Sequence, residues 1–199
     1  VHDGLLAYKN LACLHSLCNA HHLRELTFVH EQRGEKIWDA WAKEMMDLLL
    51  LAKQEVEAFG GPLPAQRQVW FENQWSELLA RGEAGNPEAT RGDSYSEKRG
   101  RVAQSKAYNL LKRLRDYRHD VWRFMTDTGV PFTNNLAEQA LRMAKVRQKI
   151  SGCFRTPQGA TTFFTIRSYM QTMRKQRVCL FDCLVSVFNA QPIQPCLGG

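Results

Sequence analysis

The middle of the chain carries a helical spacing of apolar residues, and this spacing constrains the fold more than any other feature. Between residues 37 and 59 the intervals are three and four, at Ile37, Trp38, Trp41, Met45, Leu48, Leu49 and Ala52. Such a spacing places the apolar side chains on one face of an α-helix. The following Gly60-Gly61-Pro62 is a sequence that ends a helix. We therefore expect a helix over 37–59.

Two further segments of the middle region repeat this period. They cover 65–81, with Val69, Phe71, Trp75, Leu78 and Leu79, and 105–127, with Tyr108, Leu111, Leu114, Val121, Trp122 and Met125. No alternating strand pattern interrupts them, so residues 35–128 are predicted to form an inserted all-helical module. The tryptophans at 38, 41, 70, 75 and 122 fall at helical spacing. Most are expected in the core, with stacking of one on a DNA base as an alternative.

The segments on either side of this module have other patterns. Residues 1–3 read as the end of a strand closed by an Asp-Gly turn, and 11–18 as a second short strand before a helix over 21–30. After an extended connector over 129–133, Asn134-Asn135 opens a helix that runs to about Lys149. The sequence then predicts Thr156 as the N-cap of a helix over 157–177, and a last helix over 180–188.

These elements divide the chain into four parts and predict a mostly α-helical fragment. The parts are 1–34 (the end of a sheet and the helix after it), 35–128 (the helical insertion), 129–177 and 178–199. Strands are expected only in the first part, so the sheet can hold at most one or two of them.

The positive charge of the chain is concentrated in one stretch. Lys and Arg number 27 against 20 acidic residues, a formal net charge of +7. Residues 140–177 hold nine of these cations and no Asp or Glu, which leaves 18 against 20 elsewhere. A basic block of this kind is typical of a nucleic-acid partner, because each neutralised phosphate releases counterions. A solvated basic face is the alternative interpretation.

Composition and local patterns exclude several classes of protein. A chain with 44% hydrophobic and 24% charged residues is typical of a globular protein. No apolar run approaches the roughly 18 residues of a membrane span. The six cysteines form no Cys-x-x-Cys pair and are expected to be reduced, as in the cytoplasm. Val1 is not an initiator methionine and no signal peptide follows it, so we expect further sequence upstream.

Two carboxylates are candidates for metal chemistry. Asp3 follows the apparent strand end, where a side chain can project from a sheet edge, and Glu138 lies in the first turn of a helix. Each also has a simpler interpretation. Asp3 is then an ordinary turn residue, and Glu138 closes a capping box with Asn135 by satisfying a backbone amide.

The string from Pro131 to Thr156, PFTNNLAEQALRMAKVRQKISGCFRT, resembles the catalytic-glutamate region of the insertion sequence 66 family of transposases. Two shorter motifs agree with it. Asp3, Gly4 and Tyr8 match the family's Asp-Gly-x-x-x-Tyr, and CNAH, with Cys18 and His21, matches its Cys-x-Ala-His. The resemblance covers residues 1–26 and 129 to about 188, while the helical middle agrees in kind only.

The resemblance implies an RNase H-like fold, of which this chain holds a part, and a triad of two aspartates and one glutamate that binds Mg²⁺ or Mn²⁺. Asp3 matches the second aspartate and Glu138 the glutamate of NNLAE, whereas the first aspartate is expected upstream of Val1. The implied reaction is phosphoryl transfer at DNA ends: hydrolysis, then attack of a 3′-hydroxyl on target DNA. A nuclease of this fold and a non-catalytic DNA-binding remnant are the alternatives.

The resemblance also implies partners and a location. Transposon ends and target DNA are the expected partners, with assembly of several copies on paired ends, no membrane and no small-molecule substrate. The expected location is the bacterial cytoplasm, on the nucleoid when the protein is bound to DNA.

Several further residues are predicted to support such a site. Arg142, Lys145 and Lys149 fall near the helical face of Glu138, with Arg147 to one side, and Arg155 and Arg167 extend the track. Such cations position a DNA backbone without reading its sequence. Asn134 and Asn135 precede the glutamate, and Cys18 and His21 are expected to support the active-site edge.

A structural zinc site in the cluster Cys13, His15, Cys18, His21 and His22 is disfavoured, because only one Cys-x-x-His pair is present. One departure from the family concerns the end of the helix over 157–177. Many relatives continue there with a glycine turn, whereas this chain has Gln176-Arg177-Val178-Cys179.

Overall fold

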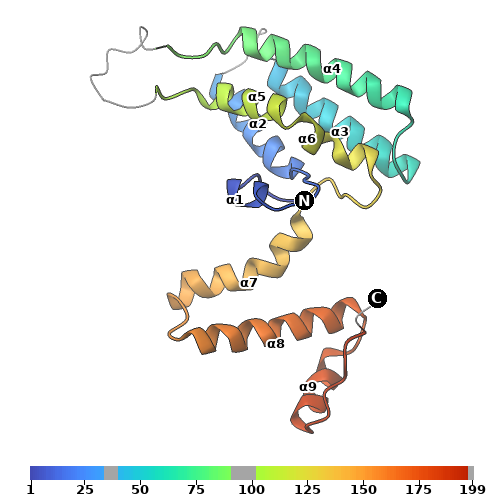
Figure 1. The fold of residues 1–199 in the computed structure, drawn as a ribbon, viewed down its shortest axis with the longest axis vertical. Helices are drawn as coiled ribbons and strands as arrows, with labels where there is room; N and C mark the ends of the chain where they lie inside the picture. Colours follow the sequence, from blue (N-terminus) through green and yellow to red (C-terminus); the bar gives the residue numbers. More distant parts are fainter. Residues whose placement is uncertain (34–39, 91–101, 197–199) are drawn as a thin grey trace. The chain divides into compact units, whose positions relative to one another are not determined.

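The computed structural model describes residues 1–33, 40–90 and 102–196, and these residues are mostly helical (Figure 1). The helices are α1 (Leu6–Lys9), α2 (Asn19–Arg33), α3 (Trp41–Phe59), α4 (Ala65–Ala84), α5 (Lys106–Asp116), α6 (Arg118–Thr126), α7 (Asn135–Ser151), α8 (Pro157–Lys175) and α9 (Leu180–Phe188). Within the described residues, β pairing is limited to one isolated parallel bridge between His2 and Leu17. The expected mostly α-helical class is confirmed, and an RNase H-like core stays a prediction.

The chain forms two compact units, Val1–Asn134 and Asn135–Gly199. In the first unit α3 and α4 lie side by side, α2 packs against α3 and α5, and α6 packs against α3 and α5 (Figure 1). Their apolar faces enclose one core, in which fully buried side chains include Leu26, Met45, Leu49, Phe71, Trp75, Leu111, Leu114 and Met125. The N-terminal segment shares this core through Leu17.

Aromatic side chains fill the centre of the first unit. The ring centroid of Trp122 lies 5.1 Å from that of Trp75, edge to face, and 5.9 Å from that of Phe71. The ring centroids of Phe124 and Phe132 are 4.9 Å apart. Trp41 is buried as well. The core assignment is therefore confirmed for Trp41, Trp75 and Trp122.

Two tryptophans of the sequence prediction lie elsewhere. Trp70 is partly exposed, and the guanidinium of Arg67 stacks 3.9 Å from its ring centroid. Trp38 lies outside the described residues, as does Ile37.

Helix ends follow the local chemistry of the sequence. α3 ends at Gly60, whose φ of 72° is the left-handed conformation that glycine adopts most easily. α8 begins after Thr156, whose side chain accepts a hydrogen bond from the Gly159 amide, with Pro157 at its first position. Both predictions are confirmed.

Three predictions for the first unit are wrong in detail. The single helix expected over 105–127 is two helices, because the backbone leaves the helical conformation at Tyr117, with φ −113° and ψ 30°. The strand expected over 11–18 is reduced to the bridge at Leu17, since residues 11–13 turn sharply instead. A short helix, α1, occupies Leu6–Lys9 where none was expected.

In the second unit, α7, α8 and α9 follow one another with little interior. Met173 and Cys183 are its only buried side chains among residues 135–196. The rings of Phe154, Phe163 and Phe164 cluster at the turn between α7 and α8, with centroids 5.2 to 5.6 Å apart. The last helix matches its predicted range, 180–188.

A residue in the left-handed conformation closes the turn between α8 and α9, where the sequence has Gln176-Arg177-Val178-Cys179. Arg177 has a φ of 60°, the left-handed conformation. Its amide donates to the carbonyl of Arg174, and the amide of Val178 donates to the carbonyl of Met173. These two bonds form a Schellman motif, which ordinarily has glycine at this position.

Candidate functional site

Asp3 lies at an exposed turn directly after the bridge residue His2. Its Oδ1 accepts a hydrogen bond from the amide of Leu5 at 3.2 Å, which closes an Asx turn. Gly4 supplies the positive φ of 88° that this turn requires. The side chain therefore has both properties considered from the sequence: it organises a turn, and its carboxylate faces solvent.

Cys18 is buried and connects the segment of Asp3 with the segment that precedes the glutamate. Its amide donates to the carbonyl of His2 at 2.9 Å. Its Sγ accepts a hydrogen bond from the amide of Asn134 at 3.3 Å, across 116 positions of sequence. The sequence placed Cys18 and Asn134 in separate motifs, and the structure brings the two motifs together. His21 follows in the first turn of α2, where its amide donates to the Cys18 carbonyl.

Glu138 lies in the first turn of α7, which begins at Asn135. It is partly exposed, and it borders a shallow hollow of about 300 Å³ on one face of this helix. The residues that line the hollow are Asn135, Glu138, Gln139, Arg142 and Lys145. The helical spacing predicted Arg142 and Lys145 beside the glutamate, and this is confirmed.

The basic side chains of α7 and of the turn after it are exposed. They are Arg142, Lys145, Arg147, Lys149 and Arg155. Arg147 lies over the ring of Phe154, with 5.5 Å between the guanidinium carbon and the ring centroid. Arg167 is partly buried in a groove between α7 and α8 that Phe163 and Phe164 also line.

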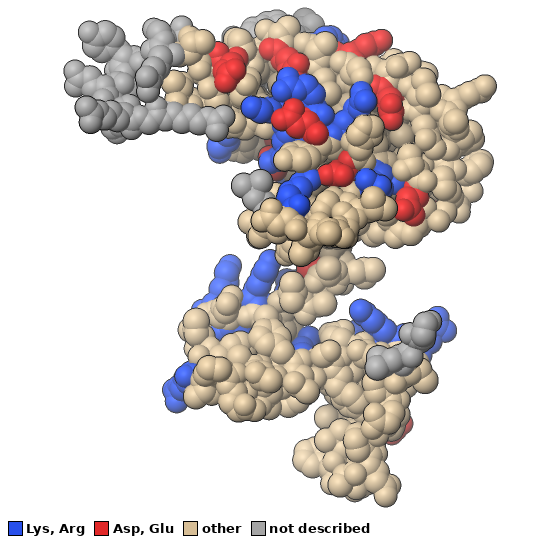
Figure 2. Space-filling model, viewed as in Figure 1, with Lys and Arg blue, Asp and Glu red and all other residues tan. Residues whose placement is uncertain are grey.

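Charge differs sharply between the two units. The first has 18 Lys and Arg against 18 Asp and Glu, whereas the second has nine against two, so the net charge of +7 belongs to the second unit. Figure 2 shows positive and negative side chains interspersed over the first unit, while nearly all charged side chains visible on the second are positive. A surface of this kind attracts a polyanion.

Three residues of the Cys and His cluster near α2 enter different interactions. Cys18 accepts from Asn134, and His22 is buried against Asn19. The Nδ1 of His15 lies 3.2 Å from the Nε2 of His2. Among the residues that the structure describes, no three His, Cys, Asp or Glu side chains are grouped to hold a metal ion.

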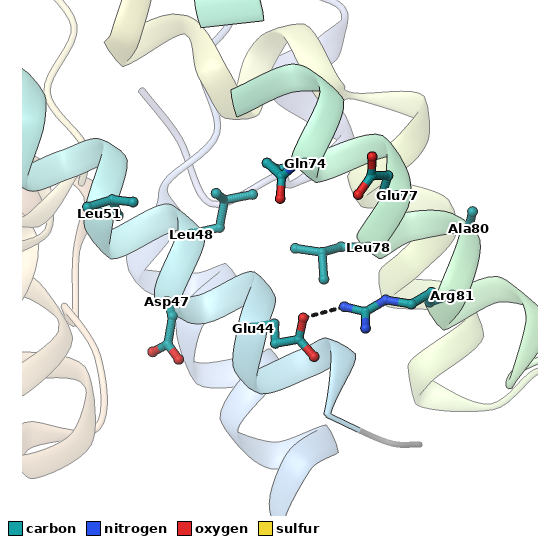
Figure 3. A pocket seen from close by; sticks show the side chains of 9 residues that line it. All are labelled: Glu44, Asp47, Leu48, Leu51, Gln74, Glu77, Leu78, Ala80 and Arg81. Carbon is teal, nitrogen blue, oxygen red and sulfur yellow. Dashed lines mark hydrogen bonds and ion pairs between the residues drawn. The ribbon is translucent and has the colours of Figure 1, made fainter. Parts of the chain in front are cut away.

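Another hollow, of about 730 Å³, opens between α3 and α4 (Figure 3). Its floor is formed by Leu48 and Leu78, and an ion pair between Glu44 and Arg81 crosses its rim. It contains none of the site residues predicted from the sequence.

No helix in the described ranges is long and apolar enough to cross a membrane.

The sequence did not single out Asn19 and Asp120, which hold the segment of Asp3 in place. Asn19 is completely buried and donates through Nδ2 to the carbonyl of Val121 at 3.0 Å. The carboxylate of Asp120 forms an ion pair with Lys9 at 2.6 Å. The backbone carbonyl of Asp120 accepts a hydrogen bond from the amide of Leu17. The one local sign of this role is that Asn19 is an uncharged polar residue inside the CNAH motif.

Comparison with protein families matches residues 1–162 to the family described as Transposase IS66 family. The match includes both candidate carboxylates, the CNAH motif and all of α7. No curated protein matches the chain, and no solved structure matches it.

Proposed function

Since the chain belongs to the IS66 family of transposases, we propose that it forms part of the catalytic region that cuts and joins DNA ends during transposition. Asp3 and Glu138 are the proposed metal-binding carboxylates, and the basic residues of α7 bind the DNA backbone. The observation that carries the proposal is the placement of Glu138 on a helix face together with Arg142 and Lys145. A carboxylate and two cations on one surface suit metal and phosphate at the same time.

The donor set fits a hard divalent cation. Asp3 presents an exposed carboxylate and Glu138 a partly exposed one, and carboxylate oxygens are the ligands that Mg²⁺ and Mn²⁺ prefer. When bound, two such ions activate the attacking oxygen and stabilise the leaving oxygen of an in-line displacement. Two carboxylates are fewer than the family's three, so the proposal requires a further aspartate in the encoded protein.

Chain connectivity supports a shared role for the two carboxylates. Asn134 is hydrogen bonded to Cys18, which is also bonded to His2, the neighbour of Asp3. The segments that precede the two carboxylates in sequence, at His2 and at Asn134, are therefore joined through Cys18 within the first unit.

The residues of this chain have separate tasks in the proposed reaction. Asp3 and Glu138 hold the ions, and Glu138 is presented by the first turn of a helix. Arg142, Lys145 and Lys149 neutralise phosphates next to the scissile bond, which fixes the position of the duplex but supplies no sequence specificity. Recognition of the transposon end must therefore come from other contacts, and assembly on paired ends is part of the proposal.

The test compares the encoded protein with its Glu138→Gln variant. We expect the variant to lose Mg²⁺-dependent cleavage of DNA ends while its affinity for the same DNA changes little, because the substitution removes a metal ligand and leaves the cations in place. Asp182→Asn, which removes the other acidic side chain of the second unit, exposed in α9, serves as the matched control and should leave cleavage unchanged. Cleavage by Glu138→Gln at the wild-type rate would contradict the assignment.

Two further outcomes would replace the proposal. Salt-sensitive DNA binding by the wild-type protein with no cleavage in any metal would identify a non-catalytic DNA-binding protein. Cleavage without joining of the 3′ end to target DNA would identify a nuclease.

A further inference from the structure

Three consecutive backbone amides, those of residues 17–19, donate hydrogen bonds to three different parts of the first unit. Leu17 donates to the carbonyl of Asp120 in α6 at 2.9 Å. Cys18 donates to His2 at 2.9 Å, and Asn19 donates to Phe132 in the connector at 3.1 Å. We call residues 17–19 the junction. It joins the Asp3 segment, the helical insertion and the connector to α7 at a single point.

Two side chains of the junction repeat these connections. The Sγ of Cys18 accepts from Asn134, and the Nδ2 of Asn19 donates to Val121 of α6. Both side chains are almost completely buried. Because a buried amide or carbonyl without a partner costs free energy, each of these bonds favours one position of the segment that it reaches.

We infer that Cys18 and Asn19 are positioning residues for the two segments of the first unit that directly precede the proposed metal-binding carboxylates in sequence. The inference rests on the proposed function. Cys18 holds His2 and Asn134, the first adjacent to Asp3 and the second four residues before Glu138. Asn19 holds the connector at Phe132 and anchors the junction on α6. Neither side chain is exposed to a metal or to DNA.

The junction also gives the helical insertion a role in the site. In its last helix, α6, the backbone carbonyls of Asp120 and Val121 accept hydrogen bonds from the junction, from the Leu17 amide and the Asn19 side chain respectively. Arg123, one helical turn from Asp120, donates to the carbonyl of His15 at 2.6 Å. A displacement of α6 would therefore move the segment of Asp3, and a misplacement of about 1 Å in an active site can cost roughly 100-fold in rate.

The experiment compares Cys18→Ala and Cys18→Ser in the encoded protein, with Cys183→Ala as the matched control. Cys183 is equally buried but belongs to the second unit, in α9. Alanine removes the acceptor for the Asn134 amide, whereas serine keeps one at the same place. The first readout is the hydrogen-exchange rate of the Asn134 amide, and the second is the Mn²⁺ concentration that gives half-maximal strand cleavage.

In Cys18→Ala we expect the Asn134 amide to exchange about tenfold faster. We also expect half-maximal cleavage to need at least about tenfold more Mn²⁺, as when a residue that orients a metal ligand is removed. Cys18→Ser should restore both values toward wild type, and Cys183→Ala should change neither. If Cys18→Ala does not fold, Cys18→Val removes the acceptor while it fills the space.

Equal Mn²⁺ requirements in Cys18→Ala and Cys183→Ala would overturn the inference, because loss of a buried thiol alone would then explain any change. A wild-type protein that cleaves no DNA would instead contradict the proposed function. In that case the exchange rate of the Asn134 amide decides whether Cys18 holds the connector, and an unchanged rate overturns this too.

Discussion

The imidazole of His22 lies 3.0 Å from the side-chain oxygen of Asn19, in the interior of the first unit. Asn19 donates through its nitrogen to the carbonyl of Val121, so it is the oxygen that faces the ring. His22 must therefore carry a proton on Nδ1. Burial lowers the pKa of His22 to about 3, helped by the nearby charge of Arg113, so the ring is neutral at physiological pH.

This buried neutral histidine should make the protein less stable in mild acid. The unfolded chain takes up a proton near the ordinary pKa of 6.5, whereas the folded chain does so only near 3. The contribution of neutral His22 to the free energy of unfolding is therefore fully present above pH 6.5. It is lost as the pH falls from 6.5 towards 3. The expected loss is about 2 kcal/mol between pH 7 and pH 5, measured by urea unfolding at each pH. His22→Gln, which keeps a donor for Asn19 but gains no proton, should remove most of this loss, and an equally large loss in that variant would refute the assignment.

A side chain at position 82 is expected to destabilise the first unit. A Cβ added there would lie 2.7 Å from Leu111 Cδ2 and 3.0 Å from Trp41, both of which are buried. Because the surrounding core is closely packed, Gly82→Ala should lower the free energy of unfolding by about 1 to 3 kcal/mol. Gly85→Ala is the control, since its Cβ would meet nothing closer than 3.8 Å. Chemical denaturation of both variants tests this, and equal stability of the two would show that the helices separate at no cost.

Arg177→Gly should stabilise the second unit. Arg177 has a φ of 60°, a conformation that costs an L-residue roughly 1 kcal/mol and costs glycine almost nothing. The Schellman bonds of its turn use backbone atoms only, so they survive the change. We expect a gain of about 0.5 to 1 kcal/mol by thermal or chemical unfolding. Arg174→Gly removes the same charge from within α8 and should lose about 1 kcal/mol instead.

Replacement of cations on α7 should weaken the salt dependence of DNA binding. Each phosphate contact contributes about 0.9 to the slope of log affinity against log salt concentration, so Arg142→Gln with Lys145→Gln and Lys149→Gln should reduce it by roughly 2 to 3. The matched control replaces Lys43, Arg81 and Lys106, three exposed cations of the first unit, by Gln. Fluorescence anisotropy over a range of salt measures both slopes. A control variant with the larger effect would place the DNA on the first unit.

Helix ends were predictable because their determinants are local. Gly60 and Thr156 act through bonds to residues four positions away or fewer, so the sequence alone contains the relevant chemistry. The break at Tyr117 was not predictable, because apolar periodicity continues through it and one changed backbone dihedral leaves no trace in the spacing. The strand expected over 11–18 failed because a short apolar stretch does not show whether a neighbouring strand exists to pair with it.

For the candidate site, the motifs identified Asp3, Glu138, Cys18 and Asn134 one by one. Their connection was out of reach, since the contact between Cys18 and Asn134 joins residues 116 positions apart. The role of Asn19 was not predictable, because its partners, Val121 and Phe132, are backbone carbonyls whose position depends on the folded insertion. The roles of these residues in catalysis stay predictions.

The junction of residues 17–19 also constrains the order in which the chain folds. Its partners are residue 2 on one side and residues 120–134 on the other, so most of its bonds close a loop of about one hundred residues. Closing so long a flexible loop is entropically costly, whereas the helices between its ends form from nearby contacts. The insertion should therefore fold first and bring its two ends together. During synthesis, the segment of Asp3 therefore reaches its final position only after Asn134, more than a hundred residues later, has been synthesised and has bonded to Cys18.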